Sequence, residues 1–374
     1  MASKLRLFTK RFFIYSNVIV ALVFLLACLV PYLNPGNWWF ISVLGLAFPI
    51  LLLLVILFLL GWLMLLRPKH ALISFISLLI GYKSISVFWA FHQPQSFKKE
   101  KQAGAIRVVS WNVARFIELK KNTNKGSETR LKMLEQLKEQ NADILCLQEF
   151  HTCTNPEFYD NIAAVQALGY PYYHFSFDAD GDRHYYSSII FSRFPIIDSG
   201  RVRFPRPSLP DVLLHADLLV NNDTLRVFTT HLQSLQFTRY DYERIEKIKS
   251  VEDSLLANSK GILSKLKKGI TYRSLQADIV HEVVGNSPHP YLICADLNDV
   301  PNSYTYFTVR GDLQDAFLKK GTGIGRSFTG LSPTLRIDYI LANNELEVLQ
   351  FKRVTRKHSD HFMLVSDMAI KSGK

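Results

Sequence analysis

Long apolar runs dominate the start of the chain. No charged residue occurs between Arg11 and Arg67, and about 20 predominantly apolar residues are enough to cross the hydrocarbon core of a bilayer. This stretch therefore has room for two membrane-spanning helices, which we predict at Phe12–Leu33 and Trp38–Leu66. The turn-forming residues 34–37 separate the two.

A third apolar run, Ala71–Phe91, is a weaker candidate for a span. It contains four serines and the charged Lys83, and a lysine inside a bilayer is costly unless it is paired or reaches the interface. We therefore predict an anchor of two to three transmembrane helices over residues 1–93. Residues 94–104 follow with the polar composition of a linker.

From residue 105 onward, short apolar runs alternate with segments of helical periodicity. Apolar residues on one helix face predict a helix at Glu128–Gln140, and we expect a longer helical stretch, Asp241–Gly285, to break near Gly269. Two apolar runs joined by residues 221–224 predict a hairpin. The predicted strands are Ile106–Ser110, Ile144–Leu147, Tyr186–Phe191, Val212–Val220, Leu225–Thr230, Tyr291–Ala295, Arg336–Leu341 and Met363–Ile370.

This mixture of elements defines the expected fold class. Strands interspersed with helices over about 270 residues are typical of an α/β domain. We predict that residues 105–374 form a four-layer α/β sandwich, in which two sheets pack face to face between outer helices. An α-helical transmembrane region would precede it.

The net charge of +12 is distributed unevenly. Residues 1–93 contain seven Lys or Arg and no Asp or Glu, so the remainder carries 37 basic and 32 acidic residues, a net charge of +5. The high isoelectric point therefore partly reflects the flanks of the apolar helices. It is weak evidence for nucleic-acid binding.

The basic residues also predict the orientation of the anchor, because Lys and Arg are enriched in cytoplasmic segments. The N-terminal tail and the loop at residues 67–69 are basic, whereas the loop at 34–37 is uncharged. Three spans would place residues 94–374 outside the cytoplasm, which is the orientation we predict. If the third segment lies in the interface instead, the domain would be cytoplasmic.

The four cysteines do not predict a disulfide framework. Cys28 lies in a predicted span, Cys146 and Cys294 lie in predicted strands, and only Cys153 lies in a polar loop. We expect buried, unpaired thiols.

Five short polar segments end or adjoin apolar runs of the α/β domain. Binding sites in α/β folds form where buried strands end. These segments offer carboxylate, amide and imidazole groups, and none contains a nucleophile motif built on Ser or Cys, so they suggest a metal-assisted hydrolase. The segments are Trp111-Asn112, Gln148-Glu149, Thr230-His231, Asp296-Leu297-Asn298-Asp299 and Ser359-Asp360-His361.

With their neighbours, these segments resemble the endonuclease/exonuclease/phosphatase superfamily, which includes pancreatic-type deoxyribonuclease, exonuclease III-type enzymes and neutral sphingomyelinases. The multi-span anchor resembles a membrane-anchored bacterial branch of that group. Each motif is weak alone, but seven occur in the family's order. They are Ser110-Trp111-Asn112, Leu147-Gln148-Glu149, residues 190–196, Thr230-His231-Leu232, residues 295–299, Arg336-Ile337-Asp338-Tyr339-Ile340 and Ser359-Asp360-His361.

The resemblance implies a catalytic imidazole. His361 matches the family's catalytic histidine, which would stabilise the pentavalent phosphate or help to position water. Asp338 matches the carboxylate that fixes the tautomer and charge of that histidine. Asp296 would orient or deprotonate the attacking water.

Two further residues would contact the phosphate. Asn298 would donate to a phosphate oxygen, and His231 occupies a position where family members place His or Tyr. The other interpretation of residues 296–299 is a turn with Asx caps.

The resemblance also implies a divalent cation, Mg²⁺ with Mn²⁺ as the alternative, because hard cations take carboxylate oxygens and waters. Glu149 is the expected principal ligand, Asn112 matches the amide beside metal and phosphate, and Asp360 matches a residue near the metal. Taken alone, Glu149 could be a surface residue and Asn112 a turn former. Ala114 stands where many nuclease members carry Asp, so an abasic-site endonuclease is a weaker candidate.

The substrate class stays open on this basis. We predict a membrane-anchored phosphoesterase, specifically a phosphodiesterase, with a phosphoester substrate and the lipid bilayer as partners and no obligate protein partner. A phospholipid headgroup is favoured slightly, because the anchor would hold the site near the bilayer. The alternatives are a nuclease acting on DNA or RNA and a non-catalytic binding module on the same fold.

Overall fold

The structure is a computed structural model that divides into two compact units. It describes residues 2–93, 96–116, 127–205, 212–238, 240–241, 243–245 and 255–371, with the backbone alone for 2–6 and 255–259. The helical unit comprises Met1–Phe88, Leu235–Ser274 and Val300–Phe307. The α/β unit comprises Trp89–Ser234, Leu275–Asp299 and Thr308–Lys374.

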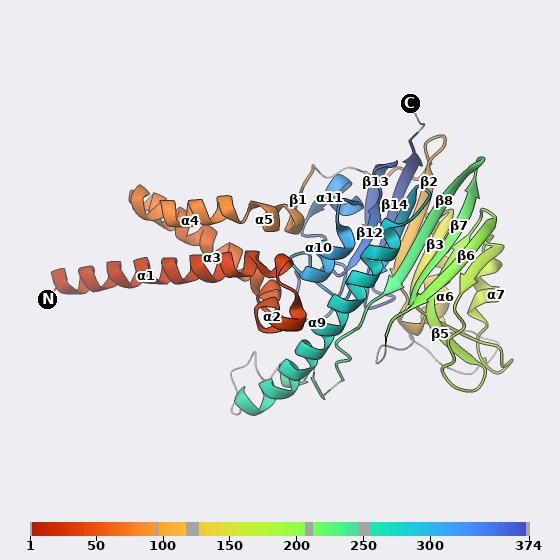
Figure 1. Cartoon of the computed structure of the whole chain (residues 1–374), viewed down its shortest axis with the longest axis horizontal. Coiled ribbons are helices and arrows are strands. Elements are labelled where there is room, and N and C mark those ends of the chain that lie inside the picture. Colours follow the sequence, from red (N-terminus) through yellow and green to blue (C-terminus); the bar gives the residue numbers. More distant parts are fainter. Residues whose placement is uncertain are drawn as a thin grey trace. The chain divides into compact units, whose positions relative to one another are not determined.

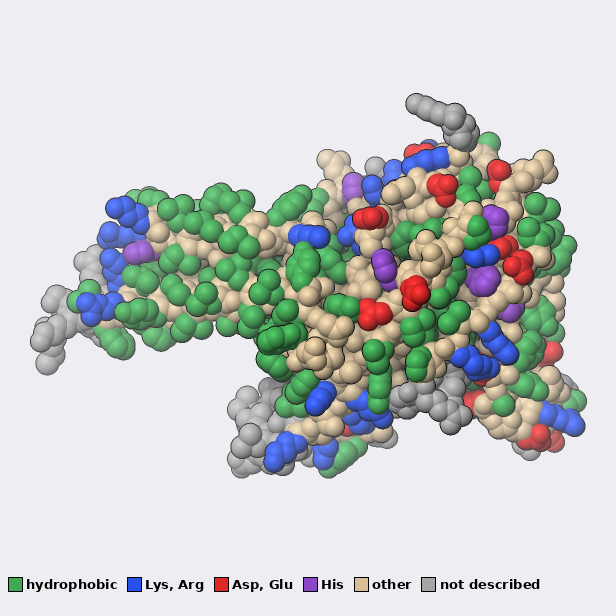
Figure 2. Space-filling view, in the orientation of Figure 1, with side chains coloured by type: hydrophobic (Ala, Val, Ile, Leu, Met, Phe, Trp, Pro, Cys, Tyr) green, Lys and Arg blue, Asp and Glu red, His purple; other side chains and the backbone are tan. Residues whose placement is uncertain are grey.

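Among its described residues, the helical unit contains two stretches long and apolar enough to cross a membrane, Leu7–Tyr32 and Pro35–Met64. Hydrophobic side chains cover the face of these helices seen in Figure 2, and basic side chains gather where the chain begins. The stretches are built from α1 (Ala2–Cys28), η1 (Val30–Tyr32), α2 (Pro35–Ser42) and α3 (Leu44–Met64).

The third apolar segment forms two helices, α4 (Pro68–Ile80) and α5 (Tyr82–Phe88), with a bend of 66° between them. Together, α4 and α5 are long and apolar enough to cross a membrane. The described residues therefore contain up to three spans if this bent pair is one span. A buried polar contact joins α4 to α1, where Ser74 Oγ donates to Asn17 Oδ1 at 2.8 Å. Such a bond between apolar helices fixes their packing.

The long helix α9 (Leu255–Gly285) continues through Gly269, so the predicted break at this glycine is wrong. A Cβ at position 269 would lie 2.7 Å from the side chain of Leu235. The glycine therefore allows close packing against the helix rather than ending it. The earlier part of the predicted helical stretch lies largely outside the described residues.

The α/β unit consists of two six-stranded sheets and a two-stranded ribbon (Figure 1). Each large sheet contains one parallel pair of strands among antiparallel neighbours. The first sheet, in the order β10–β12–β9–β8–β7–β6, contains β6 (Ile196–Arg203), β7 (Val212–Val220), β8 (Asp223–His231), β9 (Tyr291–Asp296), β10 (Gln314–Asp315) and β12 (Asp338–Ala342).

The second sheet has the order β13–β14–β2–β3–β5–β4. Its strands are β2 (Ile106–Asn112), β3 (Ile144–Cys153), β4 (Tyr172–Phe175), β5 (His184–Ser192), β13 (Leu346–Val354) and β14 (Met363–Ile370). The ribbon pairs β1 (Ala90–Phe91) with β11 (Thr322–Gly323). The other elements among the described residues are η2 (Ala114–Phe116), α6 (Glu128–Gln140), α7 (Asn161–Gln166), α10 (Tyr304–Arg310) and α11 (Ala316–Lys320).

Alternating residues of the central strands build two separate cores, because successive side chains of a strand point to opposite faces. Val108 belongs to the core between the sheets, together with residues of β8 and β9. Its neighbour Val109 belongs to the core that α6 and α7 cover. Burial on both faces explains why these strands are continuous apolar runs. The predicted four-layer sandwich of two sheets and outer helices is confirmed.

Most predicted strands lie where the pattern placed them. The hairpin between β7 and β8 turns on Asn221 and Asn222, which both have positive φ, as a two-residue type I′ turn requires. The strand predicted to end at Leu147 instead continues to Cys153, which is buried rather than in a polar loop. All four cysteines are buried free thiols, as predicted.

Candidate active site

Strand register brings three of the candidate residues together at one edge of the first sheet. His231 ends β8 and Asp296 ends β9, and the parallel register pairs these two residues. On the other side of β9, antiparallel pairing sets Asp338, the first residue of β12, opposite Asp296. Residues 65 and 42 positions apart in the sequence therefore become neighbours.

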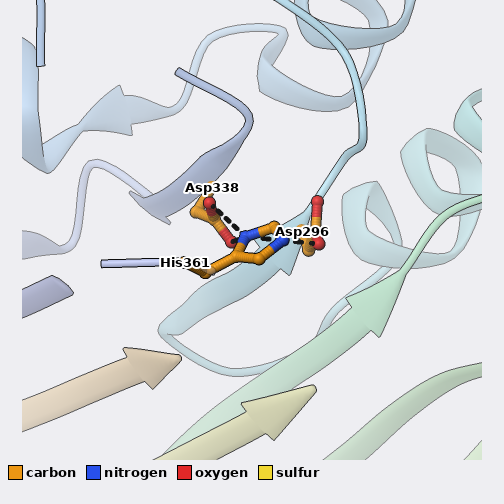
Figure 3. Close-up of side chains that lie close together, drawn as sticks. All are labelled: Asp296, Asp338 and His361. Atoms are coloured by element: carbon orange, nitrogen blue, oxygen red, sulfur yellow. Dashed lines mark hydrogen bonds and ion pairs between the residues drawn. The ribbon is translucent and has the colours of Figure 1, made fainter. Parts of the chain in front are cut away.

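His361 lies against this edge and is hydrogen-bonded to Asp338 (Figure 3). Nδ1 of His361 is 2.9 and 3.0 Å from the two carboxylate oxygens of Asp338 and 3.7 Å from Oδ2 of Asp296. The three side chains are buried, with exposures of 0 to 5%. The imidazole therefore stands between two carboxylates in a site that excludes most water.

This arrangement favours a charged imidazole. Burial alone disfavours the imidazolium, but the negative charges of Asp338 and Asp296 more than offset burial and raise the pKa of His361 to about 10. The indole Nε1 of Trp111 donates to the backbone oxygen of His361 at 2.9 Å, which helps to hold the imidazole in place. At neutral pH the site thus contains a fixed cation.

Both carboxylate oxygens of Asp296 are held by hydrogen bonds. Its Oδ2 accepts a hydrogen bond from Asn112 Nδ2 and its Oδ1 accepts one from the backbone N–H of Asn298, both at 2.9 Å. Burial, and after it the charge of Asp338, raises the pKa of Asp296. A carboxylate with a raised pKa is a stronger base, which suits a group that accepts a proton from water.

Asn298 and His231 form a second polar contact beside Asp296. Nδ2 of Asn298 donates to the backbone oxygen of Leu232 at 3.0 Å and lies 2.9 Å from Nε2 of His231. Asn298 has φ of +50°, a strained conformation for a residue with a side chain. The backbone of this loop is therefore held in a shape that aims the amide toward His231.

Glu149 reaches the same region from the second sheet. It lies at an irregularity in the pairing of β3 with β5 and has φ of +49°. Its Oε1 is 3.4 Å from Nε2 of His231, and its side chain is 28% exposed. In the adjacent parallel strand, Asn112 pairs with Gln148, next to Glu149 in the sequence. The bulge thus turns Glu149 toward the ends of β8 and β9.

Two groups of side chains fit a divalent cation. Among the described residues, Asp296, Asp338 and His361 offer ligand atoms within 4.8 Å of one another. The Nδ1 atom of His361 is already engaged by Asp338, however, which suits a charged hydrogen-bonded pair better than a metal ligand. Glu149 and Asn112 carry the hard oxygen donors that Mg²⁺ prefers, and Oδ1 of Asn112 accepts a hydrogen bond from the backbone N–H of Ala114 at 2.9 Å.

Asp360 differs from the other candidates in its exposure, and its charge acts on the imidazole of His361. Its side chain is exposed, and Ser359 Oγ donates to its Oδ1 at 3.2 Å. The structure brings together the remaining seven candidates: Asn112, Glu149, His231, Asp296, Asn298, Asp338 and His361. Their roles as ligands or catalysts stay predictions.

Sequence reasoning missed residues that support the site from a distance. The buried Ser327 Oγ accepts the backbone N–H groups of Ile337 and Asp338, at 2.9 and 3.0 Å. The ring of Phe328 packs on the imidazole of His361 with 5.0 Å between centroids. Both lie in a loop without a strand pattern, so no local sequence pattern marks them.

The family assignment follows from comparison with known families. Residues 109–361 match the model of the endonuclease/exonuclease/phosphatase family. Because this match covers more than half of the chain, the chain belongs to that family. Residues 10–88 match the model of a domain of unknown function. A search of curated proteins found no match.

A solved structure with a TM-score of 0.50 shows the same fold, and two others are similar to this chain at 0.49. An endonuclease/exonuclease/phosphatase from Beutenbergia cavernae is 19% identical, with a TM-score of 0.50 and 72% of each chain covered. The human Nocturnin catalytic domain with bound sulfate is 18% identical, with a TM-score of 0.49, 72% of this chain covered and 95% of that one. A humanized D. rerio TDP2 is 18% identical, with a TM-score of 0.49 and coverages of 71% and 99%. At these identities the likeness concerns the fold alone.

Proposed function

We propose that this protein is a membrane-anchored, divalent-metal-dependent phosphoesterase, specifically a phosphodiesterase that cleaves a P–O bond by attack of water. The observation that carries the proposal is the buried imidazole of His361 between Asp338 and Asp296. It lies beside the amide and imidazole of Asn298 and His231 in a chain of the endonuclease/exonuclease/phosphatase family. Charged donors fixed in a buried site stabilise the charge that develops at phosphorus.

Each residue has a role that its surroundings support. Asp296 accepts the proton of the attacking water, because burial and the charge of Asp338 raise its pKa and make it a stronger base. The imidazolium of His361 donates to a phosphate oxygen and stabilises the pentavalent transition state, while Asp338 keeps it charged. Asn298 and His231 bind the remaining phosphate oxygens.

Glu149 and Asn112, with Asp360 at the exposed side, would hold Mg²⁺ or Mn²⁺. When bound, such an ion neutralises phosphate charge and stabilises the leaving oxygen. Oε1 of Glu149 lies 3.4 Å from Nε2 of His231, and Asn112 pairs with Gln148, next to Glu149 in the sequence. The negative charge of Asp338 and Asp296 exceeds the single positive charge of His361, which favours a cation nearby.

The apolar helices would act as the anchor. We propose a multi-pass protein of a bacterial-type cell membrane, with an anchor at 1–93, a linker at 94–104 and a catalytic domain at 105–374. The basic tail and the basic loop at 67–69 would stay cytoplasmic, and a third span would place the catalytic domain outside.

An exposed position tests this orientation without disturbing the site. The four native cysteines are buried, so a Lys357→Cys variant offers one accessible thiol on the α/β unit. Labelling of intact cells by a membrane-impermeant maleimide is expected. Labelling only after lysis would place the domain in the cytoplasm.

Turnover of the full chain in lipid nanodiscs tests the catalytic proposal. A bis-aryl phosphodiester is expected to be cleaved faster than its monoester, and EDTA should abolish the reaction. Glu149→Gln should raise the Mg²⁺ concentration for half-maximal rate by about tenfold or more. Glu128→Gln, on the 83% exposed side chain of α6, is the matched control. No EDTA-sensitive turnover of either ester with any divalent ion would contradict the proposal.

Salt dependence separates the two substrate classes. A nuclease loses affinity for DNA or RNA steeply as salt rises, in proportion to the phosphates it contacts. A lipid phosphodiesterase is expected to act on phospholipid in vesicles with a weaker dependence on salt. We propose the lipid or other small phosphodiester as the first substrate to test, because the anchor would hold the site near the bilayer.

A further inference from the structure

The segment that follows the Asp296–Asp299 loop packs within the helical unit. Residues Val300–Phe307 belong to that unit, whereas Asp299 still belongs to the α/β unit. Asn302 is 1% exposed, and its Nδ2 donates to the backbone oxygen of Ala27 at 2.9 Å. Ala27 is the penultimate residue of α1, where backbone oxygens lack partners in the helix. The side chain of Asn302 therefore caps the end of an apolar helix.

A second helix contacts the same residue through a glycine. Gly45 is the second residue of α3, and a Cβ at this position would lie 2.5 Å from the backbone oxygen of Asn302. Real Cβ atoms do not approach backbone oxygens so closely, so only glycine lets α3 and this segment pack as they do. Both helices therefore hold Asn302.

The far end of the segment is held by aromatic and cationic side chains. The ring of Phe307 lies 6.2 Å from that of Tyr32, between centroids. The ammonium group of Lys83 lies 5.3 Å from the centre of the Tyr32 ring and 5.8 Å from that of Phe307. The charged residue of the third apolar segment thus has partners, as a lysine among apolar helices requires.

Only two residues separate Asn302 from Asp299, the last residue of the Asp296–Asp299 loop. The backbone oxygen of Asp299 accepts a hydrogen bond from the hydroxyl of Tyr339 in β12, at 2.9 Å. Val300 and Pro301 then lead to Asn302, and the proline restricts the backbone of this short link. A shift of Asn302 would be passed to Asn298, whose strained conformation depends on its surroundings.

We propose that Asn302 is a positioning residue, through which the packing of α1 and α3 holds the Asp296–Asp299 loop in its active shape. Turnover would then depend on the apolar helices, and not only on the α/β unit. This inference rests on the proposed function for its effect on turnover. Its structural part, the dependence of the loop on the helices, can be measured without any substrate.

Two glycines of α3 provide a matched pair of variants in the full chain. Gly45→Ala places a methyl group against the backbone of Asn302, whereas a Cβ at Gly61 meets nothing within 4 Å. Since displacements near 1 Å can cost about 100-fold in rate, we expect Gly45→Ala to lower kcat by about 10- to 100-fold with little change in KM. Gly61→Ala should keep the wild-type kcat.

Amide hydrogen exchange of the peptide covering residues 296–307 provides the readout that is independent of activity. Exchange should accelerate in Gly45→Ala and not in Gly61→Ala, while exchange in α6 stays unchanged. If the wild type shows no turnover, the proposed function fails and this measurement still decides the inference. If neither kcat nor exchange distinguishes Gly45→Ala from Gly61→Ala, the inference is overturned.

Asn302→Asp gives a second test should Gly45→Ala fail to fold. It keeps the size of the side chain but removes the amide donor to Ala27. We expect faster exchange at 296–307 and a lower kcat at an unchanged KM. Wild-type exchange and kcat in Asn302→Asp would overturn the inference.

Discussion

Two buried histidines of the α/β unit, His361 and His151, have opposite electrostatic environments. His361 is 5% exposed and stands between Asp338 and Asp296, which raise its pKa to about 10. His151 is 4% exposed and lies in β3, with its Nε2 atom 3.0 Å from Nδ1 of His184. Burial, followed by His184 and Arg115, lowers the pKa of His151 to about 4.

The comparison shows what distinguishes a candidate catalytic histidine from a packed one. Burial disfavours the charged form of both rings, so burial alone gives a neutral imidazole. Two carboxylates reverse this outcome at His361, and they leave the site with more negative than positive charge. Such an arrangement suits a site that binds a cation and a phosphate.

Removing each imidazole in turn should give the largest difference in kcat between the candidate catalytic histidine and the packed one. We expect His361→Ala to lower kcat by about 10²- to 10⁴-fold, because it removes a charged donor from the transition state. His151→Gln should leave kcat within about threefold of wild type, since ordinary substitutions away from the chemistry change little. Initial rates on the phosphodiester check this, and equal loss in both variants would contradict the distinction.

Replacing Asp338, the partner of His361, should lower the pKa of His361 and make its environment more like that of His151. Asp338→Asn keeps the shape but removes a charge, so the pKa of His361 should fall by about 1–3 units. The imidazolium would then be lost at lower pH, and kcat at pH 9 should decrease by about 2- to 100-fold. A pH–rate profile tests this expectation. An alkaline limb at the same pH as in wild type would show that another group titrates there.

The two histidines should affect stability with opposite signs. The folded pKa of His361 lies above its ordinary value of 6.5, so its contribution is complete below pH 6.5 and is lost as pH rises through about 10. The folded pKa of His151 lies below 6.5, so the unfolded chain takes up a proton more readily and stability falls from pH 6.5 toward about 4.

This acid-side effect at His151 is the smallest that we predict. His151→Gln removes the titrating group, so the thermal midpoint should fall less steeply between pH 6.5 and 4 than in wild type. Tryptophan fluorescence of the full chain in nanodiscs measures the midpoint at each pH. Identical slopes for the variant and wild type would assign the acid sensitivity to other groups.

Much of the fold could be predicted from local sequence patterns. The helix at Glu128–Gln140 and the strand at Val212–Val220 have the predicted limits, because side-chain period and burial are recorded in neighbouring residues. The break expected at Gly269 was wrong, since a glycine can serve packing as well as helix termination. Only the contact with Leu235 shows that Gly269 serves close packing rather than helix termination.

The candidate site could be predicted only in part from the sequence. Motif order indicated its residues, but the positive φ of Glu149 and Asn298 and the supporting Ser327 could not be foreseen. These features depend on strands and loops that are distant in sequence. The pKa of His361 likewise depends on how closely Asp338 and Asp296 approach it.

By itself, the sequence determined the apolar helices, the strand-rich domain and the types of polar groups at its strand ends, because each follows from residues close together in the chain. The tertiary structure decided which of those groups meet. It paired Asp338 with Asp296 through strand register, hydrogen-bonded His361 to Asp338, and placed Asn302 against Ala27 across 275 positions. Contacts between distant residues arise only when the buried faces of sheets and helices pack, and no local pattern contains that information.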